Sequence, residues 1–284
     1  MIRSPRVIAE PAERPTYFAS DIAYVWNKLV LRGFDRAIYV WGEDHQGDVP
    51  RLMAVTKALG LDANRVVLLI YRFITLMRNG QEVRMGKRSG NIVTLDDVVD
   101  EVGADATRFV LLSRTIDTKI VFDLDLVKKQ SDENPVYYVQ YAHARICSIL
   151  RKAAEEGGGG EEEQGRKRAE IGDSGLVIGS KFPDAVSNLK SQISLYAHPS
   201  ELALIRKLLE LEEVVDLVAT QLQPHHLPAY AQSLATTFSA FYRDCHVLGE
   251  TPEVTAARLR LVRATQATLA NTLALMGMSA PEKM

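Results

Sequence analysis

A ten-residue segment, 82–91, combines cations with glycines in a way that suits phosphate chemistry. It reads EVRMGKRSGN and places Lys87 and Arg88 between Gly86 and Gly90. Glycine lets the backbone change shape, and a cationic loop can stabilise negative charge that builds up in a transition state. A solvated basic turn has the same composition, so the surrounding sequence must decide between the two interpretations.

The residues before this segment predict a β-hairpin that would hold it. Residues 70–77 are apolar and rich in β-formers, and Asn79 with Gly80 supplies the left-handed dihedrals of a tight turn. Residues 83–85 can return as the second strand. The cations of the loop, which include Arg84, then follow directly from the hairpin.

Length and composition indicate a globular protein with room for two domains. The chain has 284 residues, of which 46% are hydrophobic and 25% charged. Because the net charge is only -2, a surface for nucleic acid must come from local clustering of cations.

Cysteine usage and the absence of long apolar runs favour the cytoplasm. Cys147 and Cys245 both fall within helical patterns, which supports neither a disulfide framework nor a zinc site. No apolar run reaches membrane-spanning length, and the first sixteen residues lack the apolar core of a secretion signal. We expect a soluble protein without a membrane partner.

The first part of the chain, to about residue 123, mixes strands and helices. Strand, helix and strand follow one another with short connections, which predicts a parallel sheet whose ligands bind at the carboxyl ends of the strands. Residues 42–47 lie at one such end. The patterns predict helices over 17–32, 49–59, 95–101 and 104–114, strands over 36–41 and 65–71, a helix stop at Gly33 and an N-cap at Thr94.

From residue 124 onward the chain reads as helix almost throughout. Apolar residues recur at spacings of three and four, which predicts a helical bundle. The expected helices cover 135–153, 201–219 after an N-cap at Ser200, 227–247, and 251–276. Residues from about 155 to 180 include a run of four consecutive glycines with acidic residues on both sides and predict a flexible insertion. The fold class is therefore α/β followed by all-α, with domains at 1–123 and 124–284.

Five motifs in order resemble the bacterial arginyl-tRNA synthetases, a family of class I aminoacyl-tRNA synthetases. They are TYFASDIAY (16–24), WGEDHQGDVPRL (41–52), RMGKRSGN (84–91), GADATRF (103–109) and ENPVYYVQYAHARICSILRKA (133–153). Several ordered motifs are far more specific than any one of them. The resemblance implies part of a Rossmann-like catalytic domain followed by a helical anticodon-binding domain.

The resemblance also implies an activity and its substrates. A family member activates L-arginine with ATP and transfers it to tRNA(Arg), with Mg²⁺ as counter-ion of the phosphates and no tightly bound cofactor. Tyr17 and Asp21 match positions that recognise arginine in the family, and an aspartate pairs well with a guanidinium. A helix-start aromatic and a solvated carboxylate would look the same.

At the strand end, Gly42, Asp44 and His45 match the family's contacts to ATP. A glycine there permits close approach of the backbone, and a carboxylate can accept the ribose hydroxyls. A metal site formed by Asp44, His45 and Asp48 is the rival interpretation. No nearby histidine or cysteine completes it, so we expect no metal site.

The basic loop stands where class I enzymes carry Lys-Met-Ser-Lys. Arg84 replaces the first lysine, Met85 is kept, Gly86 replaces serine, and Lys87 keeps the second lysine. The resemblance implies that Lys87, with Arg84 and Arg88, neutralises the departing pyrophosphate. The hydroxyl of the family's serine is absent here.

The helical part would bind tRNA. The DATR sequence (105–108) resembles the Asp-Ala-Leu-Arg element of the family's anticodon-binding domain. Tyr137, Tyr141 and Arg145 are spaced by four on one helix, and such a stripe can stack on unpaired bases. Core packing is the alternative for the tyrosines. Three cations of the last helix could meet phosphates, namely Arg258, Arg260 and Arg263.

The family's second phosphate-binding element, His-x-Gly-His, is not found in this sequence. We therefore expect the chain alone to be inactive as a ligase, as the carboxy-terminal part of an enzyme that is monomeric when intact. An open sheet could lead to self-association. One alternative is a non-catalytic tRNA-binding module, and a weaker one is a nucleotidyltransferase of similar sheet topology.

Overall fold

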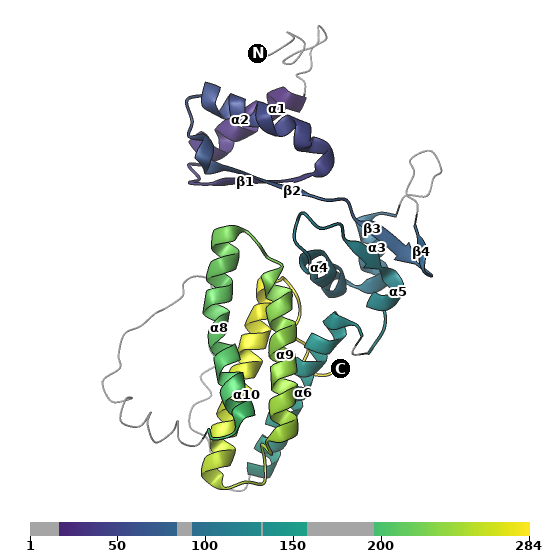
Figure 1. The fold of residues 1–284 in the computed structure, drawn as a ribbon, viewed down its shortest axis with the longest axis vertical. Helices are drawn as coiled ribbons and strands as arrows, with labels where there is room; N and C mark the ends of the chain where they lie inside the picture. Colours follow the sequence, from purple (N-terminus) through teal and green to yellow (C-terminus); the bar gives the residue numbers. More distant parts are fainter. Residues whose placement is uncertain (1–16, 84–92, 132, 158–195) are drawn as a thin grey trace, which may run out of the picture. The chain divides into compact units, whose positions relative to one another are not determined.

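The computed structural model describes residues 17–83, 93–131, 133–157 and 196–284. Contacts divide the chain into two units. The first unit, which we call the sheet unit, comprises Met1–Val83 and Arg114–Phe122. The second, the helical unit, comprises Arg84–Ser113 and Asp123–Met284 (Figure 1). The predicted order of α/β followed by all-α is confirmed.

The sheet unit alternates short helices and strands. Its elements are α1 (Tyr17–Trp26), the π-helical turn η2 (Asn27–Leu31), β1 (Ala37–Gly42), the 3-10 turn η3 (Glu43–Asp48), α2 (Val49–Ala58), η4 (Ala63–Arg65), β2 (Val66–Tyr71), β3 (Thr75–Arg78), β4 (Gln81–Glu82) and most of β5 (Val121–Asp123). β1 and β2 pair in parallel, with Ala37 opposite Val66, as the sequence predicts.

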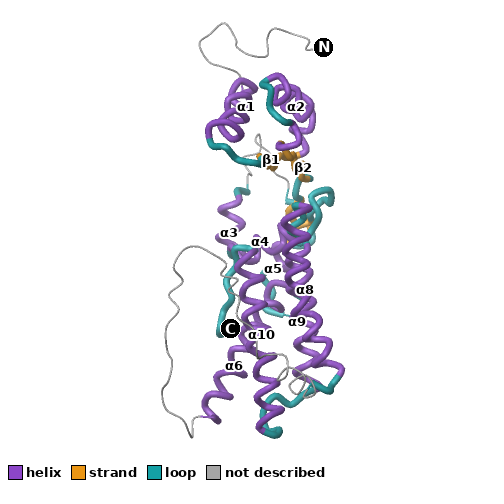
Figure 2. Tube along the Cα trace, turned by 90° about the vertical axis from the view of Figure 1, so that its left-hand side faces the viewer, coloured by secondary structure: helices purple, strands orange, loops and turns teal. Residues whose placement is uncertain are grey.

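One face of the parallel pair is covered. α1 and α2 lie on the same side of β1 and β2 in both views (Figures 1 and 2). Between them lies an apolar core built around Val25, Leu29, Tyr39 and Leu52. The alternate residues of β1 point the other way, and Ile38 and Val40 are 41% and 62% exposed.

The predicted helix over 17–32 is confirmed, with a change of pitch. Its last turn is π-helical, because the amide of Arg32 donates to the carbonyl of Asn27 at 2.8 Å. Gly33 then adopts a φ of 66°, the left-handed conformation that ends helices. Asn79 and Gly80, with φ of 52° and 70°, form the predicted tight turn.

The strand predicted over 65–71 and the hairpin are confirmed, but the first arm of the hairpin, predicted over 70–77, is interrupted between residues 71 and 75. The chain forms β2 and β3 instead, since the amide of Arg72 donates to Ile116 at 3.1 Å and that of Phe73 to the Glu43 carboxylate at 3.1 Å. The amides of Arg72 and Phe73 therefore make no hydrogen bond to β1, and β2 ends at Tyr71. β3 pairs with β4 on one side and β5 on the other, and β5 was not predicted. Within the predicted return strand 83–85, residues 84 and 85 lie outside the described residues.

The helical unit contains the predicted bundle. Its elements are α3 (Leu95–Val102), α4 (Ala104–Leu112), α5 (Leu124–Val127), α6 (Pro135–Gly157), α8 (Pro199–Gln221), α9 (His226–Asp244) and α10 (Pro252–Leu275). Among the described residues, the long helices α6, α8, α9 and α10 pack together and run side by side (Figures 1 and 2). α3 and α4, which precede the predicted domain boundary, belong to this unit, and α4 contacts α6 and α9.

Capping residues fix where these helices begin. Thr94 caps α3 as predicted and forms a capping box with Asp97, and Thr251 caps α10. The expected N-cap Ser200 is wrong, because His198 takes this place and Pro199 begins α8. Most of the predicted insertion, from residue 158, lies outside the described residues.

Both cysteines and the apolar character of the helices can be compared with the sequence expectations. Cys147 and Cys245 are both free and buried. Of the helices in the described parts of the chain, none is long and apolar enough to cross a membrane.

Candidate functional site

At the end of β1 the Asp44 side chain lies close over Gly42. A Cβ on Gly42 would lie 2.6 Å from Oδ1 of Asp44 and 3.6 Å from the ring of Phe73. The backbone of Gly42 is extended, with φ of -71°, so any side chain here would require the exposed Asp44 carboxylate to move. The turn η3 that follows carries Asp44 and His45 at the carboxyl end of the strand, where parallel sheets bind ligands.

Two carboxylates flank the His45 imidazole. Nε2 of His45 lies 3.6 Å from Asp44, and Nδ1 lies 3.6 Å from Asp48. The ring also packs against Trp41, with 6.0 Å between ring centroids. All three polar side chains are more than 40% exposed. Searched over the described residues only, the chain shows no group of three or more such side chains placed to hold a metal ion.

Asp21 belongs electrostatically to this strand end. Burial raises the pKa of its carboxyl, the charge of Asp48 raises it further, and His45 lowers it. Asp21 of α1 therefore lies near enough to η3 to feel the charges of Asp48 and His45. Tyr17, four residues earlier on α1, is 94% exposed and forms the start of the helix.

An aromatic cluster beside Asp21 has no motif that would have revealed it. The ammonium of Lys28 lies 3.5 Å from the ring centre of Tyr39 and 3.9 Å from that of Tyr24. Burial lowers the pKa of Lys28 and raises that of Tyr39 to about 12. The Tyr39 hydroxyl is buried and lacks a hydrogen-bond partner in the described structure. Lys28 follows Asp21 by seven residues, which is about two helical turns, and this spacing is the only sequence signal that places the two on one helix face.

Glu43 ties the strand end to the segment that leads to the hairpin. Its carboxylate accepts from the amide of Phe73 at 3.1 Å and from Nη1 of Arg72 at 2.8 Å. The Phe73 amide and then the Arg72 guanidinium lower the pKa of Glu43. Sequence reasoning missed this role. The residues of the basic loop, namely Arg84, Met85, Gly86, Lys87 and Arg88, lie outside the described residues.

A second site lies in the helical unit, on α6 and α9. The rings of Tyr137 and Tyr141 stack, with 5.8 Å between centroids and 12° between planes. Tyr141 and Arg145 are exposed. The guanidinium carbon of Arg145 lies 5.0 Å from the ring centre of Tyr242. Arg145 of the predicted stripe on α6 therefore contacts Tyr242 of α9.

A cavity of about 290 Å³ adjoins this stripe. Besides Tyr141 and Arg145, its lining consists of Tyr138, Ala142, Phe238, Ser239 and Tyr242. The rings of Phe238 and Tyr242 stack, with 6.2 Å between centroids. Flat aromatic faces, a guanidinium and hydroxyls suit the face and edge of an unpaired base. Apolar spacing along a helix reports only the residues that pack into the bundle, so sequence reasoning missed Tyr242.

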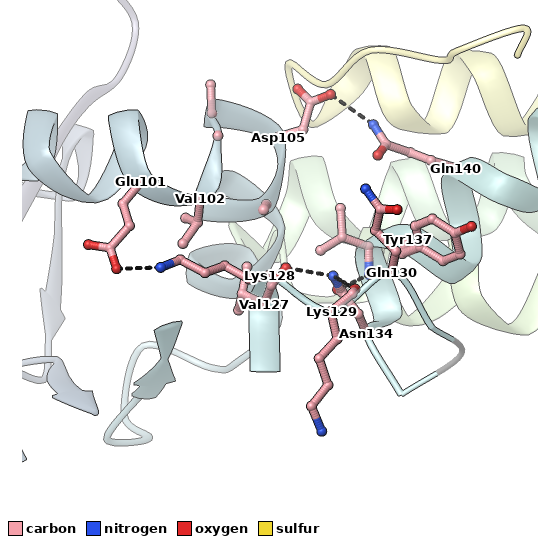
Figure 3. A pocket seen from close by; sticks show the side chains of 14 residues that line it. Glu101, Val102, Asp105, Val127, Lys128, Lys129, Gln130, Asn134, Tyr137 and Gln140 are labelled. Carbon is pink, nitrogen blue, oxygen red and sulfur yellow. Dashed lines mark hydrogen bonds and ion pairs between the residues drawn. The ribbon is translucent and has the colours of Figure 1, made fainter. Parts of the chain in front are cut away.

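Tyr137 lines a different cavity, of about 560 Å³, at the start of α4 (Figure 3). Two lysines on its wall are paired within the protein. Nζ of Lys128 lies 2.7 Å from Glu101, and Nζ of Lys129 lies 2.8 Å from Glu133. The stacked tyrosines thus lie between two cavities.

The three arginines of α10 differ in their surroundings. Nε of Arg258 donates to Glu201 at 2.7 Å, and Nη1 donates to the carbonyl of His246 at 2.7 Å. Its side chain is 14% exposed and that of Glu201 is 1% exposed. Arg258 therefore joins α10 to α8 inside the protein. Arg260 and Arg263 are exposed.

Two family models match the chain. The model for the catalytic domain of class I tRNA synthetases (R) matches residues 3–146, and the DALR anticodon binding domain matches residues 139–284. Each covers half of the chain or more.

Known proteins resemble the chain over nearly all of its length. An arginine–tRNA ligase from Dehalococcoides mccartyi is 48% identical over 278 residues, which are 98% of this chain and 45% of that protein. A crystal structure assigned as an arginyl-tRNA synthetase, from Campylobacter jejuni, has a TM-score of 0.75 and 29% identity, covering 98% of this chain and 54% of that one. The Thermus thermophilus arginyl-tRNA synthetase, 24% identical with a TM-score of 0.71, covers 98% and 50% and supports the fold alone. The chain spans about half the length of the relatives it matches.

Proposed function

The chain belongs to the class I arginyl-tRNA synthetases, and from this premise we propose that it supplies the carboxy-terminal part of an arginine–tRNA ligase. In that reaction the arginine carboxylate attacks the α-phosphate of ATP and pyrophosphate leaves. The arginyl group then passes to the terminal ribose of tRNA(Arg). The match of the catalytic-domain model to residues 3–146 favours this over a module that only binds tRNA.

In the sheet unit we assign the substrates to the end of β1. Asp21 would pair with the arginine guanidinium, with Tyr17 beside it on α1. The tight turn at Gly42 would let ATP approach the backbone, and Asp44 and His45 would contact its adenosine part. This assignment is supported by the electrostatic proximity of Asp21 to His45 and Asp48.

The roles of the basic loop and of Mg²⁺ rest on the sequence. Lys87, Arg84 and Arg88 would neutralise the leaving pyrophosphate, with Met85 and Gly86 next to ATP. Mg²⁺ would supply positive charge to the phosphates of ATP. The described residues contain no cluster that fits it as a protein-held ion, so no step is assigned to a metal ligand here.

The helical unit would bind the anticodon arm of tRNA(Arg). The observation that carries this proposal is the cavity that Tyr141 and Arg145 share with Tyr242. Stacking of a base on an aromatic ring contributes roughly 1–3 kcal/mol, and an arginine adds a cation contact. Arg260 and Arg263 would meet phosphates. We leave Arg258 out, because its guanidinium is paired with Glu201.

Binding of an anticodon stem-loop tests the RNA interface. Fluorescence anisotropy with a labelled tRNA(Arg) stem-loop should show binding by the whole chain. Tyr141→Ala and Arg145→Ala should each weaken it by about tenfold or more, as expected for a lost stacking or cation contact. Arg206→Ala, which removes an exposed cation of α8 outside the cavity, is the matched control. Equal affinity of all four proteins would refute the assignment.

A charging assay tests the ligase assignment. The chain with ATP, arginine and tRNA(Arg) should give no arginyl-tRNA, because its sequence lacks His-x-Gly-His. Addition of an amino-terminal fragment of a relative that carries this element should restore charging. Charged tRNA from the chain alone would overturn the prediction of inactivity.

A further inference from the structure

The last eight residues of the chain, 277–284, follow α10 as a segment without helix or strand, which we call the terminal strap. Gly277 turns the chain out of α10 with a φ of 68°. Met276 and Met278 on either side of it are buried and anchor the start of the strap. The strap lies against α4 and α6 through hydrogen bonds.

α4 holds the beginning of the strap through two residues. Nη1 of Arg108 donates to the carbonyl of Gly277 at 2.9 Å. Oδ2 of Asp105 accepts from the amide of Ser279 at 3.1 Å and also from the Ser279 hydroxyl. Asp105 and Arg108 are the first and last residues of the DATR sequence. Both of these residues therefore bind another segment of the same chain.

Asp105 also holds α6. Nε2 of Gln140 donates to the same Oδ2 of Asp105 at 2.8 Å (Figure 3). The Gln140 amide lies 3.2 Å from the carbonyl of Ser279 as well. One carboxylate oxygen thus joins α4, α6 and the strap. A carboxylate is suited to this, because it accepts several hydrogen bonds and donates none.

α6 continues the contact along one face. Nδ1 of His143 lies 2.9 Å from the carbonyl of Pro281, and Nη1 of Arg151 donates to the carbonyl of Glu282 at 3.3 Å. With Gln140 these residues form a stripe at helical spacing. Most of these contacts use backbone atoms of the strap, and the Ser279 hydroxyl adds a side-chain contact.

This stripe and the proposed RNA interface lie on different sides of the same helix. Successive residues of a helix are rotated by about 100°, so Tyr141 and Arg145 are each turned by about 100–160° from Gln140 and His143. Whatever fixes the rotation of α6 about its axis also fixes where Tyr141 and Arg145 point. The strap and Asp105 hold one side of α6, and the cavity lies on another side of the same helix.

We infer that the terminal strap, held by Asp105, is a positioning element that sets α6 for RNA binding. Asp105 acts through α6 and does not itself contact RNA. The expected effect on RNA affinity rests on the proposed RNA-binding function, but the docking of the strap can be measured without RNA.

The test uses hydrogen exchange and RNA binding on the whole chain. In Asp105→Ala, the amide of Ser279, which donates to Asp105, should exchange about tenfold faster or more, because it loses its charged acceptor. The amides of 137–145 should also lose protection, and affinity for the stem-loop should fall by about fivefold or more. Asp216→Asn, which removes an exposed carboxylate of α8, is the control and should change neither.

A second variant guards against loss of folding. Ser279→Pro removes the amide proton and hydroxyl that Asp105 accepts, yet it lies outside every helix. It should reproduce the effects of Asp105→Ala on residues 137–145 and on RNA affinity while helical circular dichroism stays unchanged. The inference is overturned if the Ser279 amide keeps its protection in Asp105→Ala. It is equally overturned if residues 137–145 and RNA affinity are unchanged in both variants.

Failure of the proposed function gives a different pattern. If the unmodified chain does not bind the stem-loop, RNA binding is refuted. The exchange of 137–145 in the two variants then decides alone whether the strap positions α6.

Discussion

The two units of the chain differ in how completely they bury their apolar surface. The helical unit closes four long helices around side chains such as Phe241 and Leu234, which are fully buried. The sheet unit covers one face of its parallel pair and leaves Ile38 and Val40 exposed on the other. Parallel sheets are normally covered on both faces, so the stability of the sheet unit depends on what is added to it. Self-association through this face stays a prediction.

The units also differ in where their charges lie. The carboxylates of the strand end, Asp44 and Asp48, are 56% and 42% exposed. In the helical unit, Glu201 is 1% exposed and pairs with Arg258, which is 14% exposed. The carboxylates of the strand end are thus exposed, whereas that of Glu201 joins two helices inside the helical unit.

The largest contrast is expected for core truncation. Phe241→Ala in α9 should cost about 3–5 kcal/mol of unfolding free energy, since a fully buried phenylalanine leaves a cavity. Val40→Ala on the exposed sheet face should cost less than about 1 kcal/mol. Urea denaturation followed by circular dichroism measures both. Similar costs would show that the sheet face is buried in solution.

The buried ion pair should give the next largest effect. Glu201→Gln leaves the Arg258 guanidinium without its main partner and should cost about 3 kcal/mol, the lower end for a broken buried pair. Arg258 keeps the His246 carbonyl and Glu250, at 2.7 and 3.3 Å, which limits the loss. Urea denaturation of Glu133→Gln, at an exposed pair, is the control. A cost no larger than that of the control would contradict the burial of the pair.

The cap of α3 should give a smaller and local effect. Thr94 accepts from the amide of Asp97 and the side chain of Asp97 returns a bond to the amide of Thr94. Thr94→Ala should cost about 1 kcal/mol. Hydrogen exchange should show it as faster exchange in the first turn of α3 with α9 unchanged. Uniform loss of protection would mean that α3 is not a local unit.

The smallest expected effect is a dependence of stability on pH, and it comes from the same cap of α3. The amide and then the hydroxyl of Thr94 lower the pKa of Asp97 in the folded chain below its ordinary value of 3.8. The contribution is therefore present above that value and is lost as pH falls through the folded pKa. Thermal unfolding between pH 5 and pH 2 should show a shallower decline for Asp97→Asn. Identical slopes would contradict the hydrogen bonds to the carboxylate.

Elements with a local signal could be predicted from the sequence. Gly33 ends α1 and η2, Asn79 with Gly80 makes the turn between β3 and β4, and Thr251 caps α10. Such signals act over a few residues, so a short window contains all the chemistry that decides them. The strand end at Gly42 could be placed for the same reason.

Features that depend on distant residues could not be predicted. The break between β2 and β3 is made by Glu43, thirty residues away from Phe73. The engagement of Arg258 is set by Glu201, fifty-seven residues away, and Asp105 meets Ser279 at a separation of 174. No periodicity in one segment reports such partners. Arg258, which its spacing marks as a candidate phosphate ligand, is therefore used in a contact within the protein.

The most direct test is a hydrogen-exchange footprint of tRNA(Arg) on the whole chain. The account predicts that bound tRNA protects residues 137–145 of α6 and 238–242 of α9, which meet at the cavity of Tyr141, Arg145 and Tyr242. Protection that is confined to the sheet unit, or tRNA binding that leaves α6 and α9 unprotected, would contradict it.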